Sequence, residues 1–94
     1  PERPAITFIS YFEFLYGIRK KDIRNKEKAI SFIEEFSIIQ TTKTTAGILV
    51  WLKEKYELPL ADLLIASQAI ENQSVLITKD NDFDKIRELN KIII

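Results

Sequence analysis

The chain has 94 residues, a length typical of one small domain. Fourteen basic and fourteen acidic side chains balance and 46% of the residues are hydrophobic, which excludes a disordered charged tail and a generally basic nucleic-acid-binding module. Because cysteine and histidine are both absent, disulfides, zinc fingers, thiol nucleophiles and imidazole acid–base catalysis are excluded as well.

The N-terminal half is predicted to form a strand, two helices and a second strand. Residues 5–9 are a β-favouring run, and Ser10 follows as the predicted N-cap of the first helix. Asn25 is predicted as the cap or turn before the second helix, in which apolar residues recur at helical spacing. Residues 37–40 contain two adjacent β-branched isoleucines, Ile38 and Ile39, which predicts a short strand.

The C-terminal half alternates in the same way. A polar stretch leads into a third helix, and the next helix, residues 60–70, is apolar on most sides and is therefore predicted to be central. The remaining predicted elements are a strand, an acidic loop, a short helix and a final strand, at residues 74–78, 80–84, 85–89 and 92–94. Strands that alternate with helices predict an α/β fold with a parallel sheet covered on both faces. Since no repeat or Gly/Ser linker interrupts the chain, residues 1–94 are predicted to form a single domain.

Glu13 has apolar or aromatic neighbours on both sides in the first predicted helix. A carboxylate near an apolar face is costly unless it is paired or binds a metal. Glu13 also follows Ser10 by three residues, which is the spacing of a capping box. The two interpretations are compatible, and both stay open at this point.

Asp62 is the only charged residue between Glu57 and Glu71, and it lies at the start of the apolar helix. An N-cap aspartate favoured by the helix dipole explains it, since the preceding Pro59 indicates a helix start nearby. A helix N-terminus facing a crevice is also a place where ligands bind, so capping does not exclude a functional role.

Asp80, Asp82 and Asp84 directly follow the predicted strand 74–78. Ligands of open parallel sheets bind outside the carboxyl ends of the strands, which is where this acidic loop should lie. An ordinary polar turn, in which Asn81 and Asp82 cap the next helix, is the alternative, and we adopt it for Asp84. Asp80 and Asp82 remain candidate site residues.

These carboxylates form a candidate site with oxygen ligands only. Hard oxygen ligands select Mg²⁺ or Mn²⁺ rather than zinc. Such ions lower the pKa of bound water and neutralise a phosphodiester oxygen, which is the usual route to nucleic-acid hydrolysis without a protein nucleophile. The residues alone therefore indicate metal-dependent phosphodiester chemistry.

Three segments carry a more specific signal, and they follow one another in a familiar order: residues 9–17 (ISYFEFLYG), 60–66 (LADLLIA) and 76–83 (LITKDNDF). As a set they resemble the PIN domain, and most of all the small VapC-type toxin ribonucleases of prokaryotic toxin–antitoxin pairs. The first is similar to the family's Ser/Thr-x-x-Glu-Leu-x-x-Gly, with Phe14 in place of leucine. The second is similar to the helix start that carries an essential aspartate, and the third to the Thr-x-(Asp/Asn)-x-(Asp/Glu)-Phe turn.

The resemblance implies a three-layer α/β/α fold with a central parallel sheet, and a Mg²⁺- or Mn²⁺-dependent endoribonuclease. It also implies metal-binding and catalytic roles for four acids, of which the last matches a position that serves in some members only: Glu13, Asp62, Asp80 and Asp82. Ser10 and Thr78 match hydroxyl positions that line the family's site, where they would orient carboxylates or bound water.

The chain departs from the family pattern at its N-terminus. PIN domains begin with a hydrophobic strand that ends in an aspartate, the first metal ligand, and this chain opens with Pro1 and a segment that follows that strand in the family. We therefore expect a PIN-like domain that lacks the usual first strand. It is either a truncated form or one whose first segment was cleaved and stays bound.

Two functions follow from the resemblance. The first is metal-dependent RNA hydrolysis by the toxin of a VapBC-type pair. The alternative is a catalytically inactive PIN-like module that acts through dimerisation and antitoxin binding, and the missing first aspartate favours it for this chain. A phosphoacceptor receiver domain ranks last, because Asp62 at a helix start inside an apolar block does not suit an exposed phosphoacceptor.

The expected partners are an RNA substrate, a cognate antitoxin protein and a second copy of the chain in a homodimer. No stretch approaches the roughly 20 apolar residues of a membrane span, and the first residues lack the layout of a signal peptide. We therefore expect a cytoplasmic protein that does not enter the membrane.

Overall fold

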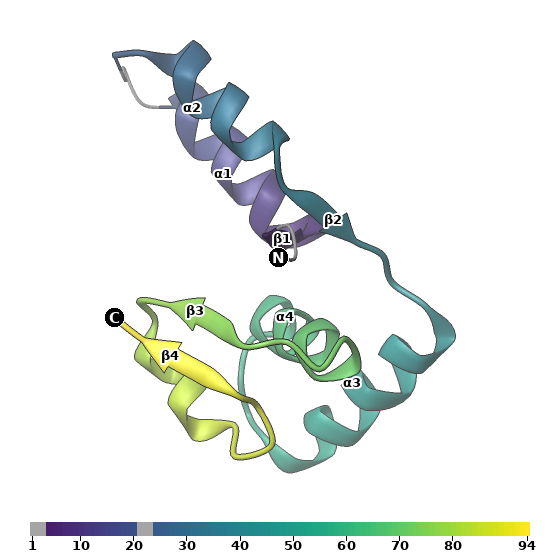
Figure 1. Ribbon diagram of the computed structural model, residues 1–94. Coiled ribbons are helices and arrows are strands. Elements are labelled where there is room, and N and C mark those ends of the chain that lie inside the picture. The colour runs from purple at the N-terminus through teal and green to yellow at the C-terminus, as the bar shows by residue number, and fades with distance from the viewer. Residues whose placement is uncertain (1–3, 21–23) are drawn as a thin grey trace. The chain divides into compact units, whose positions relative to one another are not determined.

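The computed structural model describes residues 4–20 and 24–94 and shows an α/β protein with parallel strands (Figure 1). The parallel α/β class predicted from the sequence is confirmed. The chain divides into two compact units, Pro1–Gln40 and Thr41–Ile94, each with its own pair of strands. The prediction of one continuous domain over residues 1–94 stays a prediction. In the described part of the chain, no helix is long and apolar enough to cross a membrane.

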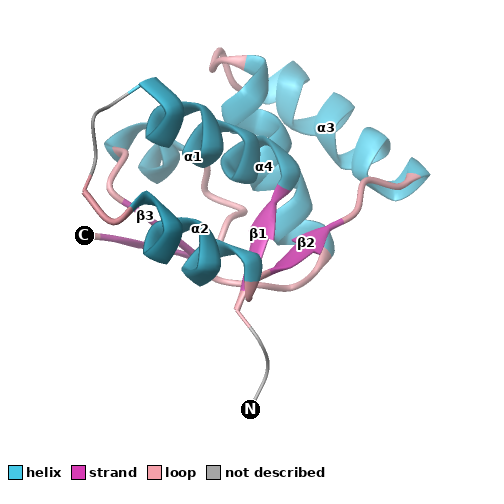
Figure 2. Ribbon diagram, turned by 90° about the horizontal axis from the view of Figure 1, so that it is seen from above, coloured by secondary structure: helices cyan, strands magenta, loops and turns pink. Residues whose placement is uncertain are grey.

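The first unit runs strand, helix, helix, strand. Its elements are β1 (Ala5–Thr7), α1 (Phe8–Lys20), α2 (Lys26–Glu34) and β2 (Ser37–Ile39). β1 and β2 pair in parallel with Ile6 opposite Ile38. The two helices that connect these strands, α1 and α2, lie side by side (Figures 1 and 2). α1 packs against both strands and against α2, and Ile18 of α1 and Ile33 of α2 are the buried apolar side chains of these helices.

The first helix begins three residues earlier than the sequence predicts, since its cap is Thr7 rather than Ser10. Residues 8 and 9, expected in the strand, already belong to α1, so Ser10 lies inside the helix and is not its N-cap. The hydroxyl of Thr7 accepts a hydrogen bond from the Ser10 amide at 3.1 Å, and Thr7 in turn donates to the Ser10 hydroxyl at 2.9 Å. Thr7 therefore does the capping, and the expected capping box between Ser10 and Glu13 does not start this helix.

Asn25 is the N-cap of α2, as the sequence predicts, although its side chain makes no capping hydrogen bond. Its φ angle is 63°, in the left-handed region that asparagine tolerates better than most residues. The residue thus starts the helix by turning the backbone.

The second unit contains two helices packed on each other and a second parallel pair of strands (Figures 1 and 2). Its elements are α3 (Lys43–Lys55), α4 (Leu60–Glu71), β3 (Leu76–Thr78), a 3₁₀ helix η1 (Asn81–Lys85) and β4 (Lys91–Ile93). α4 is central, as predicted: most of it from Leu63 to Ala69 is buried. Further buried apolar side chains come from α3, from the connection to α4 and from the segment after β3: Leu52, Leu58, Phe83, Ile86 and Leu89.

The segment after β3 differs from its prediction. The sequence predicts an acidic loop at residues 80–84 and a short helix at residues 85–89, whereas the helical turn is η1 itself, Asn81–Lys85. The N-cap is Asp80 rather than Asn81 or Asp82, because the Asp80 side chain accepts a hydrogen bond from the Asp82 amide. Burial of Phe83 then anchors the turn to the core of this unit.

A carboxylate network joins the start of α3 to the end of α4. Thr42 caps α3 and forms a capping box with Thr45, and both threonine hydroxyls donate to the carboxylate of Glu71. These hydrogen bonds to the charged form lower the pKa of Glu71. We call these three residues the Glu71 network; it fixes one end of the α3–α4 pair.

A second network lies at the other end of α3. Lys55 forms an ion pair with Glu88, and the Tyr56 hydroxyl donates to Glu88 Oε1 at 2.6 Å. The same hydroxyl accepts a hydrogen bond from the Arg87 amide at 3.2 Å. The hydrogen bonds from Lys55 and Tyr56 lower the pKa of Glu88 from 4.5 to about 2. Lys55, Tyr56 and Glu88 are called the Glu88 network below.

We expect Leu52→Ala to lower the free energy of unfolding by about 2–5 kcal/mol, because Leu52 is fully buried where α3 faces α4 and its truncation leaves a cavity. Val50→Ala on the same helix is the matched control, since Val50 is 60% exposed and its truncation should change stability by less than about 0.5 kcal/mol. Urea unfolding followed by circular dichroism measures both. Equal midpoints for the two variants would contradict this assignment of the core.

The low pKa of Glu88 predicts a defined loss of stability in acid. Because the folded-state pKa lies below the unfolded value, the stabilisation is complete above about pH 4.5 and is lost as the pH falls towards about 2. Glu88→Gln should therefore be less stable than wild type at pH 7 and should lose less stability between pH 4.5 and 2. Urea unfolding at a series of pH values tests this, with Glu54→Gln on exposed α3 surface as the control for losing one negative charge.

Candidate metal centre

Asp62 lies in the first turn of α4, three residues after Pro59, which is the N-cap. The prediction that Asp62 itself caps the helix is therefore wrong, because the helix already begins at Leu60. A carboxylate in the first turn is still favoured by the partial positive charge of the helix N-terminus. Asp62 is half-buried.

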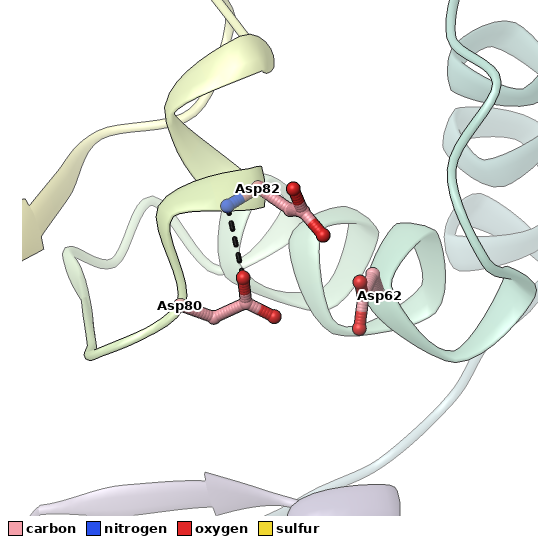
Figure 3. A group of neighbouring side chains, drawn as sticks. All are labelled: Asp62, Asp80 and Asp82. Atoms are coloured by element: carbon pink, nitrogen blue, oxygen red, sulfur yellow. Dashed lines mark hydrogen bonds between the residues drawn. The ribbon is translucent and has the colours of Figure 1, made fainter.

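Asp80 and Asp82 are placed by hydrogen bonds at the carboxyl end of β3. The Asp80 amide donates to the hydroxyl of Thr78, the last residue of β3, at 3.1 Å. The Asp82 amide donates to Asp80 Oδ1 at 2.9 Å, the bond drawn in Figure 3. Two successive turns of backbone are thus fixed by side chains of the site itself. Both aspartates are exposed.

The structure brings Asp62, Asp80 and Asp82 together. One carboxylate oxygen from each lies within 4.8 Å of the others, and the side chains of Asp80 and Asp82 point toward Asp62 on α4 (Figure 3). We call these three residues the acidic cluster. Lys85 lies beside one member of the cluster, with its ammonium 3.5 Å from Asp82 Oδ1, in an exposed pair that adds little.

The donor set fits a hard divalent cation. All three groups are carboxylates, and carboxylate oxygens are the ligands that Mg²⁺ and Mn²⁺ prefer. Like charges this close repel one another, so an ion placed among them would be attracted by every member of the acidic cluster. The acidic cluster is therefore suited to bind a cation beside the end of β3. Because Asp80 and Asp82 are exposed, this position is open to solvent and to a ligand.

The remaining predicted site residues have different positions. Glu13 and Ser10 belong to α1 in the first unit, where Glu13 is exposed and Ser10 is bonded to Thr7. Their contribution to the site stays a prediction. Thr78 lies in the second unit and supports the Asp80 amide. Asp84 is exposed on η1 and is not a member of the acidic cluster, in line with its expected role in an ordinary turn.

Sequence reasoning missed the Glu71 and Glu88 networks. In each network the glutamate is 26 to 33 positions away from its partners in the chain, so no local spacing reveals these contacts. A partial signal exists for one network, because Thr42 and Thr45 have the i, i+3 spacing of a capping box. For the Glu88 network the sequence offers no comparable signal.

Comparison with known proteins places the chain in a family. The PIN domain family matches residues 2–89, which is nearly the whole chain. None of the curated proteins matches it.

Solved structures with the same fold come from toxin–antitoxin complexes. A toxin–antitoxin complex from Klebsiella pneumoniae contains a chain 27% identical, with a TM-score of 0.79 over 100% of this chain and 78% of that one. VapBC2 from Rickettsia felis, bound to a DNA fragment from its promoter, contains a chain 26% identical, with a TM-score of 0.76 over 98% and 75% of the two chains. VapBC-5 from Mycobacterium tuberculosis, at 17% identity, shares the fold with a TM-score of 0.79 over 100% and 84%.

The match over residues 2–89 agrees with the parallel α/β architecture and with the order of the three motifs along the chain. The structural neighbours come from toxin–antitoxin complexes, one of them a VapBC complex, and so indicate the VapC-type branch of the PIN domain family. The chain thus belongs to the PIN domain family, and its fold is that of the VapC-type PIN domains found in VapBC complexes.

Proposed function

We propose that this protein is a metal-dependent endoribonuclease and the toxin of a VapBC-type toxin–antitoxin pair. The observation that carries the proposal is the acidic cluster: three aspartates from two separate elements converge within 4.8 Å beside the end of β3. Family membership supports the same reaction class, since the chain shares the PIN fold over nearly its full length. The substrate class proposed is RNA, which is cleaved by hydrolysis of a phosphodiester bond.

In this proposal Asp62 and Asp80 hold Mg²⁺ or Mn²⁺ together with Glu13 of α1, and Asp82 assists. The bound ion would supply an activated water and would neutralise charge on the phosphodiester. Thr78 holds the Asp80 loop at the end of β3 through the Asp80 amide. Ser10 is proposed to orient a carboxylate or a bound water from α1.

The proposed partners follow from the structural neighbours. These include VapBC complexes and a toxin–antitoxin complex, which supports a cognate antitoxin as the partner of this chain. A homodimer is proposed as the assembly. The cytoplasm is the proposed location, because the proposed RNA substrate is found there.

One observation favours the alternative, an inactive PIN-like module that acts by dimerisation and antitoxin binding. Phe8, Phe12 and Tyr16 follow one another at helical spacing on α1 and are 58%, 53% and 50% exposed. Exposed aromatic residues of this kind are frequent anchors of protein interfaces. The two functions are separated by the cleavage experiment below.

The proposed function predicts that the 94-residue chain cleaves mixed single-stranded RNA with Mn²⁺ and loses this activity in EDTA, whereas the inactive module predicts no cleavage under either condition. Asp62→Asn should lower the rate by more than about 100-fold, since replacing a metal ligand costs at least as much as replacing a group that only orients one. Asp84→Asn is the matched control and should cleave at the wild-type rate, because Asp84 lies outside the acidic cluster. Gel electrophoresis of end-labelled RNA measures all four conditions.

Glu13→Gln belongs in the same series and should behave like Asp62→Asn. Cleavage that survives Asp62→Asn or EDTA would identify a contaminating nuclease and contradict the proposal. No cleavage by wild type would leave the inactive interaction module as the function of this chain.

Divalent metal should also stabilise the folded protein. Repulsion within the acidic cluster opposes folding of the metal-free chain, and an ion that binds only the folded state adds about 2.7 kcal/mol when present at 100 times its Kd. Thermal unfolding should therefore shift upward with Mn²⁺ and return with EDTA in wild type and in Asp84→Asn. Asp80→Asn should show a much smaller shift. A wild-type transition that does not respond to Mn²⁺ would count against a metal centre.

A further inference from the structure

The Glu88 network connects the C-terminal end of α3 to residues 87 and 88, which follow η1 in the chain. Lys55 is the last residue of α3 and Tyr56 is its C-cap, so both are fixed by the helix. The Tyr56 hydroxyl makes two contacts at once, donating to Glu88 Oε1 at 2.6 Å and accepting from the Arg87 amide at 3.2 Å. One side chain thereby holds both a side chain and the backbone of residues 87 and 88.

This network differs from an ordinary surface ion pair. Exposed pairs add little to stability, but the Glu88 side chain is only 19% exposed and its neighbours Ile86 and Leu89 are buried on either side. The Lys55 ammonium also lies 4.8 Å from the centre of the Trp51 ring, a cation–π contact that restricts its freedom. Glu88 therefore meets two partners whose positions are already set.

Hydrogen bonds continue from this segment to the acidic cluster. The Ile86 amide donates to the carbonyl of Phe83 at 3.1 Å, and the Phe83 amide donates to the carbonyl of Asp80 at 3.4 Å. Phe83 is buried, so η1 does not rotate freely between these bonds. Holding residues 87 and 88 against α3 therefore also restricts the backbone of Asp80 and Asp82, through these hydrogen bonds and the buried Phe83.

Asp62, the third member of the acidic cluster, is also held in position relative to α3, but through helix packing. Asp62 is carried by α4, which packs along α3 within the second unit. α3 therefore supports both parts of the acidic cluster. It supports Asp62 through helix packing, and Asp80 and Asp82 through the Glu88 network. Without that network, electrostatic repulsion would favour movement of the η1 segment away from Asp62.

We propose that Tyr56 and Glu88 are positioning residues of the acidic cluster, which hold Asp80 and Asp82 close enough to Asp62 for one divalent cation to be shared among them. The proposal rests on the metal site of the proposed function and deepens it. Neither residue touches the ion or the substrate. Each acts through the backbone of residues 80–88.

The test is the affinity of the full chain for Mn²⁺, measured without RNA from the electron paramagnetic resonance signal of the free ion. Tyr56→Phe keeps the ring and removes only the hydroxyl, and Glu88→Gln keeps the shape and removes the charge. Both should weaken Mn²⁺ binding by about tenfold, the lower end of the effect seen when a group that orients metal ligands is lost. The measurements are made at a temperature at which circular dichroism shows every variant folded.

Glu71→Gln is the matched control, because it perturbs the network at the opposite end of the α3–α4 pair, which holds no part of the η1 segment. It should lower the melting temperature in EDTA as the other variants do, yet bind Mn²⁺ like wild type. Equal weakening by Glu71→Gln would show that general stability sets the affinity and would overturn the positioning role.

Two further results separate this proposal from the proposed function. Wild-type affinity in both Tyr56→Phe and Glu88→Gln overturns the positioning role and leaves the metal centre intact. An absence of Mn²⁺ binding by wild type removes the metal centre itself, and the positioning role with it.

Discussion

The acidic cluster holds three carboxylates close together, and the packing of the second unit has to overcome their electrostatic repulsion. Two unit charges about 4 Å apart repel by about 1 kcal/mol in bulk water and by about 4 kcal/mol near a protein surface. Asp80 and Asp82 are exposed, so their repulsion lies near the lower figure. Burial of Phe83 or Ile86 contributes roughly 1.5–3 kcal/mol each towards holding the η1 segment in place against that repulsion. The apolar residues of η1 and its flank share this task with the Glu88 network, which holds residues 87 and 88 against α3.

The sequence predicts those features that depend on local chemistry. The apolar helix around Asp62 is predictable because a single charge stands out within it, and the strand before Asp80 because four apolar or β-branched residues precede a polar turn. The rule that parallel sheets bind ligands at the carboxyl ends of their strands predicts the position of Asp80 and Asp82, whereas a role shared with Asp62 was implied by the family resemblance. For Glu13 the motif is equally clear, but its participation in a metal site stays a prediction, because it depends on packing between segments far apart in the chain.

The errors have a common physical origin, which is competition between chemically similar groups. Thr7 and Ser10 both carry a hydroxyl able to cap α1, and the earlier one does so, which lengthens the helix at the expense of the strand. Asp80 likewise caps η1 where Asn81 or Asp82 has the same chemistry. The Glu71 and Glu88 networks were beyond prediction for another reason: they require α3, α4 and the η1 segment to be packed before their partners meet.

The hydrogen bond from the Asp82 amide to Asp80 has a consequence for how fast a ligand can be exchanged. It uses Oδ1 of Asp80, and no hydrogen bond within residues 4–20 and 24–94 occupies the other oxygen. The loop is therefore ordered before any cation arrives, and little conformational entropy remains to be lost on association. Cation binding should then proceed without a slow loop rearrangement, with its rate set by the dehydration of the ion rather than by the protein.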